Sequence, residues 1–92
     1  MKIKSIVFSK KMKKDLKLAS KRGYNISKFN KILEMICNFE TLPEKYCDHS
    51  LIGNYVGYRE CHIEPDWLLI YKIENDTLTL ILSRSGTHSD LF

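Results

Sequence analysis

The stretch GYRECHIEPDWLLIYKIENDTLTLILS, residues 57–83, decides the fold because apolar and polar side chains alternate along it. Residues 57–63 predict a strand that Pro65 ends, and residues 67–73 predict the next strand. A short polar turn then reverses the chain, so that residues 77–83 complete a hairpin. In the first of these strands the alternation defines two faces, with Tyr58, Glu60 and His62 on one and Arg59, Cys61 and Ile63 on the other.

The residues before this stretch follow a helical period instead. Residues 2–8 are rich in β-branched and apolar side chains and predict a strand, after which Ser9 caps a helix over about residues 10–22. A second amphipathic helix begins at Asn25 or Ser27, and we expect the two helices to form a hairpin. The order β-α-α-β-β-β predicts an α+β fold with the helices on one face of a mainly antiparallel sheet.

Length and composition limit what the chain can be. Its 92 residues predict one domain, residues 1–92, and 43% hydrophobic with 28% charged residues is a globular composition. No apolar run approaches the roughly 20 residues of a membrane span. The N-terminus also lacks the features of a secretory signal. We therefore expect a cytoplasmic protein without a membrane partner.

The charge is distributed unevenly along the chain. The formal net charge is +4, but residues 1–31 contain eleven basic residues and one acid, Asp15, whereas residues 32–92 carry a net charge of −6. A segment this basic is typical of a surface that docks a polyanion. The alternative is a solvated lysine-rich helix face, and charge alone does not separate the two.

Three histidines and one aspartate are candidates for proton transfer. His49, His62 and His88 each lie beside a turn or a strand end, where a rigid sheet presents functional groups to solvent. Asp66 follows Pro65, which stiffens the turn, so its carboxylate is placed to orient an imidazole or to accept a proton. Histidine suits both the acid and the base role because its pKa lies near neutrality.

Two arginines and a tryptophan allow two interpretations each. Arg59 and Arg84 are the arginines outside the basic segment, and their planar guanidinium groups suit a phosphate. A structural salt bridge to Glu60 or Glu64 is the alternative. We expect Trp67 to fill the core on the residue pattern alone.

The cysteines predict neither disulfides nor a metal site. Cys37, Cys47 and Cys61 are odd in number and form no paired pattern. Zinc ligation by Cys47 with His49, or by Cys61 with His62, lacks the spacing of common zinc sites. We therefore expect reduced thiols and no metal or other cofactor.

Three local patterns, in this order and at this spacing, resemble the YafQ-type ribonuclease toxins of the RelE/ParE superfamily. They are DHxL at residues 48–51, GYRxxHxEPDW at residues 57–67 and GTHxxLF at residues 86–92. The resemblance covers essentially the whole chain. It implies a RelE-like fold, metal-independent cleavage of mRNA on the ribosome, and silencing by a cognate antitoxin, for which the basic segment calls for an acidic partner segment.

The resemblance also implies roles for single residues. The catalytic positions it marks are His49, His62, Asp66 and His88. It marks Trp67 and Phe92 as supporting or base-contacting residues. Phe92 stacks on an unpaired base in this interpretation, whereas the residue pattern alone favours a hydrophobic plug at the sheet edge.

The chemistry of RNA cleavage assigns these groups provisional tasks. The 2′-hydroxyl of RNA attacks the adjacent phosphate if a base removes its proton and an acid protonates the leaving oxygen. We expect His88 to be the acid, His62 or His49 with Asp66 to be the base system, and Arg59 or Arg84 to be the phosphate clamp.

Three other functions remain as alternatives. A ParE-like toxin poisons a topoisomerase without cutting RNA, but such members lack the histidine and aspartate set that is present here. A zinc hydrolase would use the same four residues as ligands. A simple RNA-binding module would act through the basic helices alone.

Overall fold

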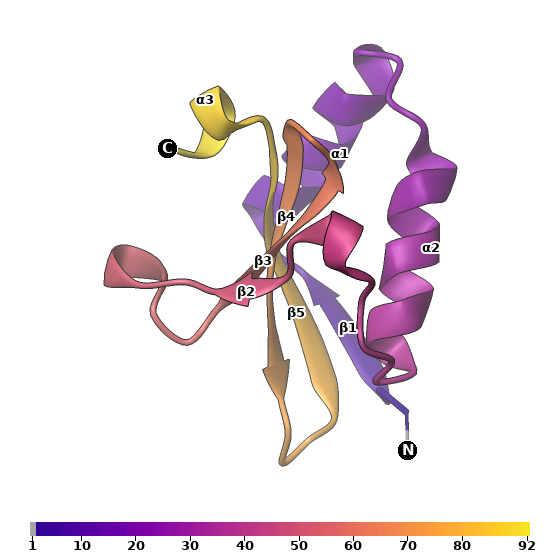
Figure 1. Cartoon of the computed structure of the whole chain (residues 1–92), viewed down its shortest axis with the longest axis vertical. Helices are drawn as coiled ribbons and strands as arrows, with labels where there is room; N and C mark the ends of the chain where they lie inside the picture. The colour runs from indigo at the N-terminus through magenta and orange to yellow at the C-terminus, as the bar shows by residue number, and fades with distance from the viewer. Residues whose placement is uncertain (1) are drawn as a thin grey trace.

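The computed structural model of the protein describes residues 2–92 and contains a five-stranded sheet in the order β1-β5-β4-β3-β2 (Figure 1). The strands are β1 (Ser5–Phe8), β2 (His49–Ser50), β3 (Arg59–Glu64), β4 (Trp67–Glu74) and β5 (Thr79–Gly86). β1 pairs in parallel with β5, whereas the other neighbours pair antiparallel. The predicted α+β fold with a mainly antiparallel sheet is confirmed.

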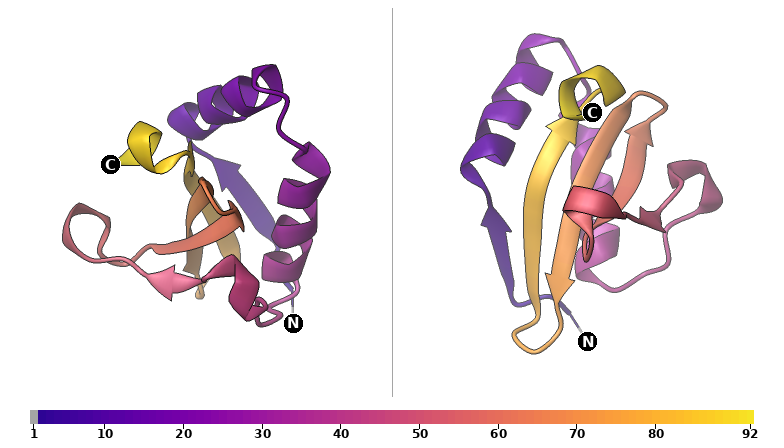
Figure 2. Two further views of the ribbon diagram at one scale, coloured as in Figure 1. Left: turned by 45° about the horizontal axis from the view of Figure 1, so that its top comes forward. Right: turned by 90° about the vertical axis from the view of Figure 1, so that its left-hand side faces the viewer.

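Two helices, α1 (Lys10–Lys21) and α2 (Ile26–Cys37), follow β1 and cover one face of the sheet (Figures 1 and 2). Each begins at a predicted cap, Ser9 for α1 and Asn25 for α2, whose side chain accepts a hydrogen bond from an amide of the first turn. The caps satisfy backbone donors that the first turn of a helix leaves without an internal partner.

The expectation of a helical hairpin is wrong. α1 packs against β5 and α2 packs against β3, so that the helices diverge from their connection at residues 22–25 (Figure 2). The reason lies in where the apolar stripes are buried. Met12 and Ala19 of α1, like Ile32 and Ile36 of α2, belong to the core against the sheet, which leaves no apolar stripe to join one helix to the other.

The core fills the space between these helices and one face of the sheet. From the three central strands it includes Cys61, Ile63, Trp67, Leu69, Tyr71, Leu80 and Leu82. Because side chains alternate along a strand, Glu60 and His62 of β3 point to the opposite face. The short C-terminal helix α3 (His88–Leu91) and the loop of residues 51–58 lie on that side (Figure 1).

Several short elements were not predicted. They are β2, α3 and two 3₁₀ turns, η1 (Glu44–Tyr46) and η2 (Gly53–Tyr55). None is long enough to show a hydrophobic period in the sequence. Among residues 2–92 there is no helix with the length and apolar character to cross a bilayer.

Candidate active site

A buried glutamate on β3 lies between two of the three histidines. Glu60 is 5% exposed, and its Oε1 lies 3.5 Å from Nε2 of His49 and 3.6 Å from Nε2 of His62. His49 reaches this position because β2 pairs with β3 in a register that sets His49 opposite Glu60. A buried carboxylate is costly unless it is paired, and each imidazole forms an ion pair with Glu60 when its ring is protonated.

The orientation of the His49 ring is fixed from its other side. Nδ1 of His49 lies 2.7 Å from the carbonyl oxygen of Cys47. A carbonyl only accepts, so Nδ1 carries a proton and Nε2 is the atom that faces Glu60. In its neutral form the ring therefore presents a lone pair at Nε2, and a proton taken up there is held beside a carboxylate. The Cys47 carbonyl therefore orients the ring, and Nε2 is the nitrogen that can accept a proton.

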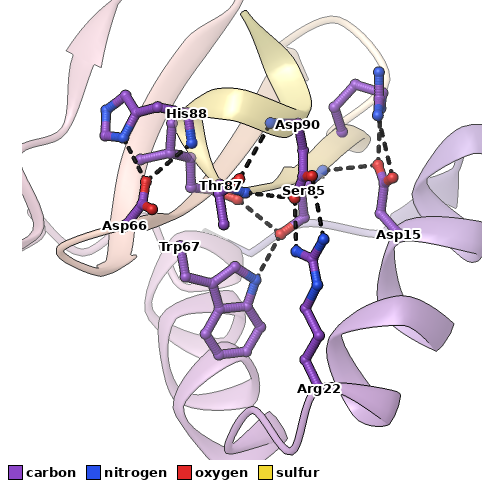
Figure 3. Close-up of polar contacts among 10 residues, drawn as sticks. Asp15, Arg22, Asp66, Trp67, Ser85, Thr87, His88 and Asp90 are labelled. Carbon is purple, nitrogen blue, oxygen red and sulfur yellow. Dashed lines mark hydrogen bonds and ion pairs between the residues drawn. The ribbon is translucent and has the colours of Figure 1, made fainter.

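The third histidine begins α3 and is bonded twice to Asp66. Oδ1 of Asp66 accepts a hydrogen bond from the backbone N–H of His88 at 3.0 Å and lies 2.7 Å from Nδ1 of the same residue (Figure 3). These two bonds hold the pKa of Asp66 below its ordinary value, and the bond from the backbone amide has the larger effect. With Nδ1–H engaged by Asp66, Nε2 is the ring nitrogen of His88 that is left for another partner.

The partner of Asp66 differs from the expectation. The expected partner of Asp66 was His49 or His62, but the carboxylate is bonded to His88. The physical reason is topological, because the turn at the start of β4 lies beside the end of β5, where Leu68 pairs with Gly86. That register brings Asp66 next to the first residue of α3.

The two histidine groups form one cluster. The rings of His62 and His88 are arranged edge to face, with their centroids 5.6 Å apart. Contacts therefore run from His49 through Glu60 and His62 to His88 and Asp66. The structure brings together the four predicted catalytic residues. It adds Glu60, which the predicted alternation had placed on the same face as His62 but which was not considered as a site residue.

α3 is held in place by a capping box and an ion pair. Oδ2 of Asp90 accepts a hydrogen bond from the amide of Thr87, and Oγ1 of Thr87 accepts one from the amide of Asp90. Arg22, next to the end of α1, binds the same carboxylate with N–O distances of 2.7 and 3.2 Å (Figure 3). A Cβ at Gly86 would lie 2.9 Å from Cβ of Asp90, so a glycine is needed where α3 folds back.

Trp67 and Arg84, which were predicted to serve the substrate, each make a polar contact within the protein. Trp67 is 2% exposed, and its Nε1 donates to Oγ of Ser85, so it supports the core. Nε of Arg84 donates to Oδ2 of Asp15 at 2.8 Å. The amide of Ser85 donates to the same oxygen (Figure 3). Asp15 therefore pairs with Arg84, and the phosphate-clamp role of Arg84 stays a prediction.

Arg59 is also engaged by a carboxylate, although not by either glutamate that the sequence suggested. Its Nε and Nη2 donate to Asp48 at 3.1–3.3 Å, and its Nη1 donates to Oγ of Ser50 at 2.9 Å. The hydroxyl of Tyr71 donates to the same carboxylate at 2.6 Å. These bonds hold the segment that carries His49, and the phosphate-clamp role of Arg59 stays a prediction.

Phe92 is available for contact. It is 65% exposed, and its ring lies edge to face with Tyr55, with 6.0 Å between the centroids. It therefore does not act as a buried plug at the sheet edge. An exposed aromatic ring that a second aromatic supports suits the stacking of an unpaired base.

The described residues do not combine into a metal-ligating group. Across residues 2–92 no three or more His, Cys, Asp or Glu side chains are arranged to hold a metal ion. Cys61 and His62 point to opposite faces of β3, and burial raises the pKa of the Cys61 thiol to about 12. Cys47 is exposed, and the structure describes all three cysteines as free thiols.

Comparison with known proteins identifies the class and then the family. Residues 4–92 match the family model described as the bacterial toxin of type II toxin-antitoxin system, YafQ. The fold and the site thus belong to a toxin of this class. Within the class, the chain belongs to the YafQ family.

Individual relatives agree with this assignment over nearly the full length. The mRNA interferase toxin YafQ of Escherichia coli K12 is 41% identical over 90 residues, which are 97% of this chain and 96% of that protein. The toxin in the crystal structure of the E. coli DinJ–YafQ toxin-antitoxin complex has a TM-score of 0.88 and 41% identity, covering 98% of each chain. A metal-bound toxin from Helicobacter pylori has a TM-score of 0.91 and 41% identity, covering 100% of each chain.

Proposed function

We propose that this chain is an endoribonuclease that cuts mRNA as the toxin of a type II toxin-antitoxin system. The observation that carries the proposal is the adjacency of two histidine–carboxylate groups, His88 with Asp66 and His49 with Glu60, on the open side of the sheet. RNA contains its own nucleophile, so cleavage needs only a base, an acid and positive charge, without a metal ion. The relatives named as mRNA interferases support the same reaction.

His88 acts as the general acid in this mechanism. Asp66 accepts the Nδ1–H bond and stabilises the imidazolium form, which delivers its Nε2 proton to the 5′-oxygen as the bond from phosphorus to that oxygen breaks. The exposed position of His88 at the start of α3 lets a substrate reach it.

His49 acts as the general base. Its Nδ1–H is fixed by the Cys47 carbonyl, and its Nε2 takes the proton of the 2′-hydroxyl while the resulting oxygen attacks phosphorus. Glu60 stabilises the imidazolium that forms. His62 lies between the two groups and contributes a hydrogen bond or positive charge to the phosphate. The products are a 2′,3′-cyclic phosphate and a 5′-hydroxyl.

The partner of this toxin is a cognate antitoxin that contains an acidic segment. The solved complex of E. coli YafQ with DinJ supports a protein partner. The basic residues 1–31 of this chain supply the complementary charge, and the same charge favours docking on the ribosome, where mRNA is cut.

The proposal is tested with purified protein and ribosomes programmed with an mRNA, followed by analysis of the ends of the products. We expect cyclic-phosphate and 5′-hydroxyl ends, and loss of cleavage when the ribose at the cut carries a 2′-deoxy substitution. Toxin that is treated with EDTA and dialysed before it meets the ribosomes should keep full activity. Loss of activity after that treatment with rescue by zinc would favour the zinc hydrolase. Growth inhibition without any RNA cleavage would favour the ParE-like alternative.

A further inference from the structure

A basic pocket adjoins the cluster on its His62 side. It has a volume of about 360 Å³ and lies between α2, η1 and the end of β3. Its polar lining consists of Lys28, Lys31, Lys45, Tyr46, His62 and Glu64. The pocket and the cluster share the side chain of His62, so they adjoin one another.

The pocket exists because β2 is short. β2 pairs only with Arg59 and Glu60, so the following residues of β3 have no strand neighbour on their outer side. α2 flanks that edge from the face with the core, and η1 flanks it from the chain segment that leads into β2. The open strand edge therefore becomes the floor of a cavity.

Two of the three lysines carry charge that no acid offsets. Lys28 forms an ion pair with Glu64. Lys31 and Lys45 are exposed, and among residues 2–92 neither has a carboxylate within ion-pair distance. The ammonium group of Lys45 lies over the ring of Tyr46 at 5.1 Å from its centroid.

The pocket lysines Lys31 and Lys45 differ in this respect from two arginines of the chain. Arg59 and Arg84 are the arginines outside the basic segment, and each forms an ion pair with an aspartate. Each nucleotide of a single-stranded RNA has one negatively charged phosphate, so charges lie on both sides of the cleaved bond. The uncompensated lysines beside His62 are placed to receive one of those charges.

We propose that this pocket binds a nucleotide that flanks the cleaved bond, with its phosphate between Lys31 and Lys45. The inference rests on the proposed function. The pocket volume is at the low end of the range for small-molecule sites, and the ring of Tyr46 with Ile63 and Pro65 offers an apolar wall for a ribose or base. The shared His62 favours RNA over an acidic segment of the antitoxin, because a strand bound at the cluster continues directly into the pocket.

The test combines a double variant with a chemically altered RNA. Lys31→Gln/Lys45→Gln is compared with Lys2→Gln/Lys4→Gln, which removes the same charge near β1, at the opposite edge of the sheet. Binding is measured with a short single-stranded 2′-O-methyl oligoribonucleotide, which cannot be cut. We expect the pocket variant to raise Kd and to reduce the slope of log K against log salt by about 0.7 to 1. The control variant should change less than the pocket variant, both in Kd and in the slope against salt.

A methylphosphonate walk locates the phosphate. Replacing one phosphate at a time by a neutral methylphosphonate should weaken binding to the wild type most at one position, and the pocket variant should be insensitive at that position. Equal Kd and slope for the pocket variant and the wild type would overturn the subsite. So would a variant that loses antitoxin affinity while keeping RNA affinity. A wild type that cuts no RNA would contradict the proposed function itself.

Discussion

Arg22 and Asp90 join α1 to α3 through two charge-assisted hydrogen bonds of 2.7 and 3.2 Å, although they are 68 residues apart in the chain. The pair anchors the helix that begins with His88. Hydrogen bonds from Arg22 and then from the Thr87 amide hold the pKa of Asp90 far below its ordinary value. The carboxylate is therefore ionised at neutral pH and keeps both the ion pair and the capping box.

Loss of this anchor should reduce cleavage more than it reduces stability. Arg22→Gln removes the ion pair but leaves the capping box of Asp90, so α3 remains helical while its position relaxes. A displacement of about 1 Å at a catalytic group can cost up to about 10²-fold in rate. We expect a fall in kcat toward that limit with a nearly unchanged Tm. Lys21→Gln, which removes an adjacent charge on α1, is the matched control, and an equal loss in both variants would show that charge and not position is responsible.

The Arg22–Asp90 pair also shows which contacts the sequence alone does not predict. Ser9 and Asn25 were predictable because a helix cap is a local pattern, and the strands of residues 57–83 were predictable because their period is visible over many residues. The partners of the arginines were not, because Arg22–Asp90, Arg84–Asp15 and Arg59–Asp48 depend on tertiary placement. The four catalytic candidates came from residue type and motif.

The link between Asp66 and α3 predicts a pH dependence. The pKa of Asp66 is lowered in the folded protein, first by the His88 amide and then by the His88 side chain. The stability that the ionised Asp66 contributes is therefore fully present above the unfolded-state pKa of about 3.9. It is lost as pH falls through the lower pKa of the folded protein. We expect the amide of His88 to stay protected from hydrogen exchange from pH 7 to about 4.5, with protection lost only in stronger acid. Asp66→Asn should lack this acid transition, and protection lost well above pH 5 would contradict the assignment.

His88→Ala separates catalysis from folding. The side chain is exposed and makes few packing contacts, so Tm should barely change, since such surface substitutions usually alter stability by no more than about 0.5 kcal/mol. Removal of a general acid should lower RNA cleavage by roughly 10²–10⁴-fold. Antitoxin affinity should persist, which gives a non-toxic protein that still forms the complex. Ser89→Ala, at the next exposed position of α3, is the control. A folded His88→Ala protein that cuts RNA at the wild-type rate would remove His88 from the mechanism.

Glu60→Gln tests the residue that the sequence motifs did not single out. The amide is nearly the same size as the carboxylate, so the buried position should still be filled and the sheet should still form, with circular dichroism and Tm close to the wild type. The amide is neutral, however, and cannot stabilise an imidazolium at Nε2 of His49 or His62 in the way the carboxylate does.

If His49 is the base, kcat of Glu60→Gln should fall by at least about tenfold. The loss should not exceed the roughly 10²–10⁴-fold rate acceleration that a general base contributes. Binding of the uncleavable 2′-O-methyl RNA should be unaffected or slightly tighter, because one negative charge is lost. Glu74→Gln removes a charge at the end of β4, outside the pocket and both histidine pairs, and it should keep nearly full kcat. Cleavage by Glu60→Gln at the rate of Glu74→Gln would show that Glu60 only fills space, and a deeper loss in His62→Ala than in His49→Ala would move the base role to His62.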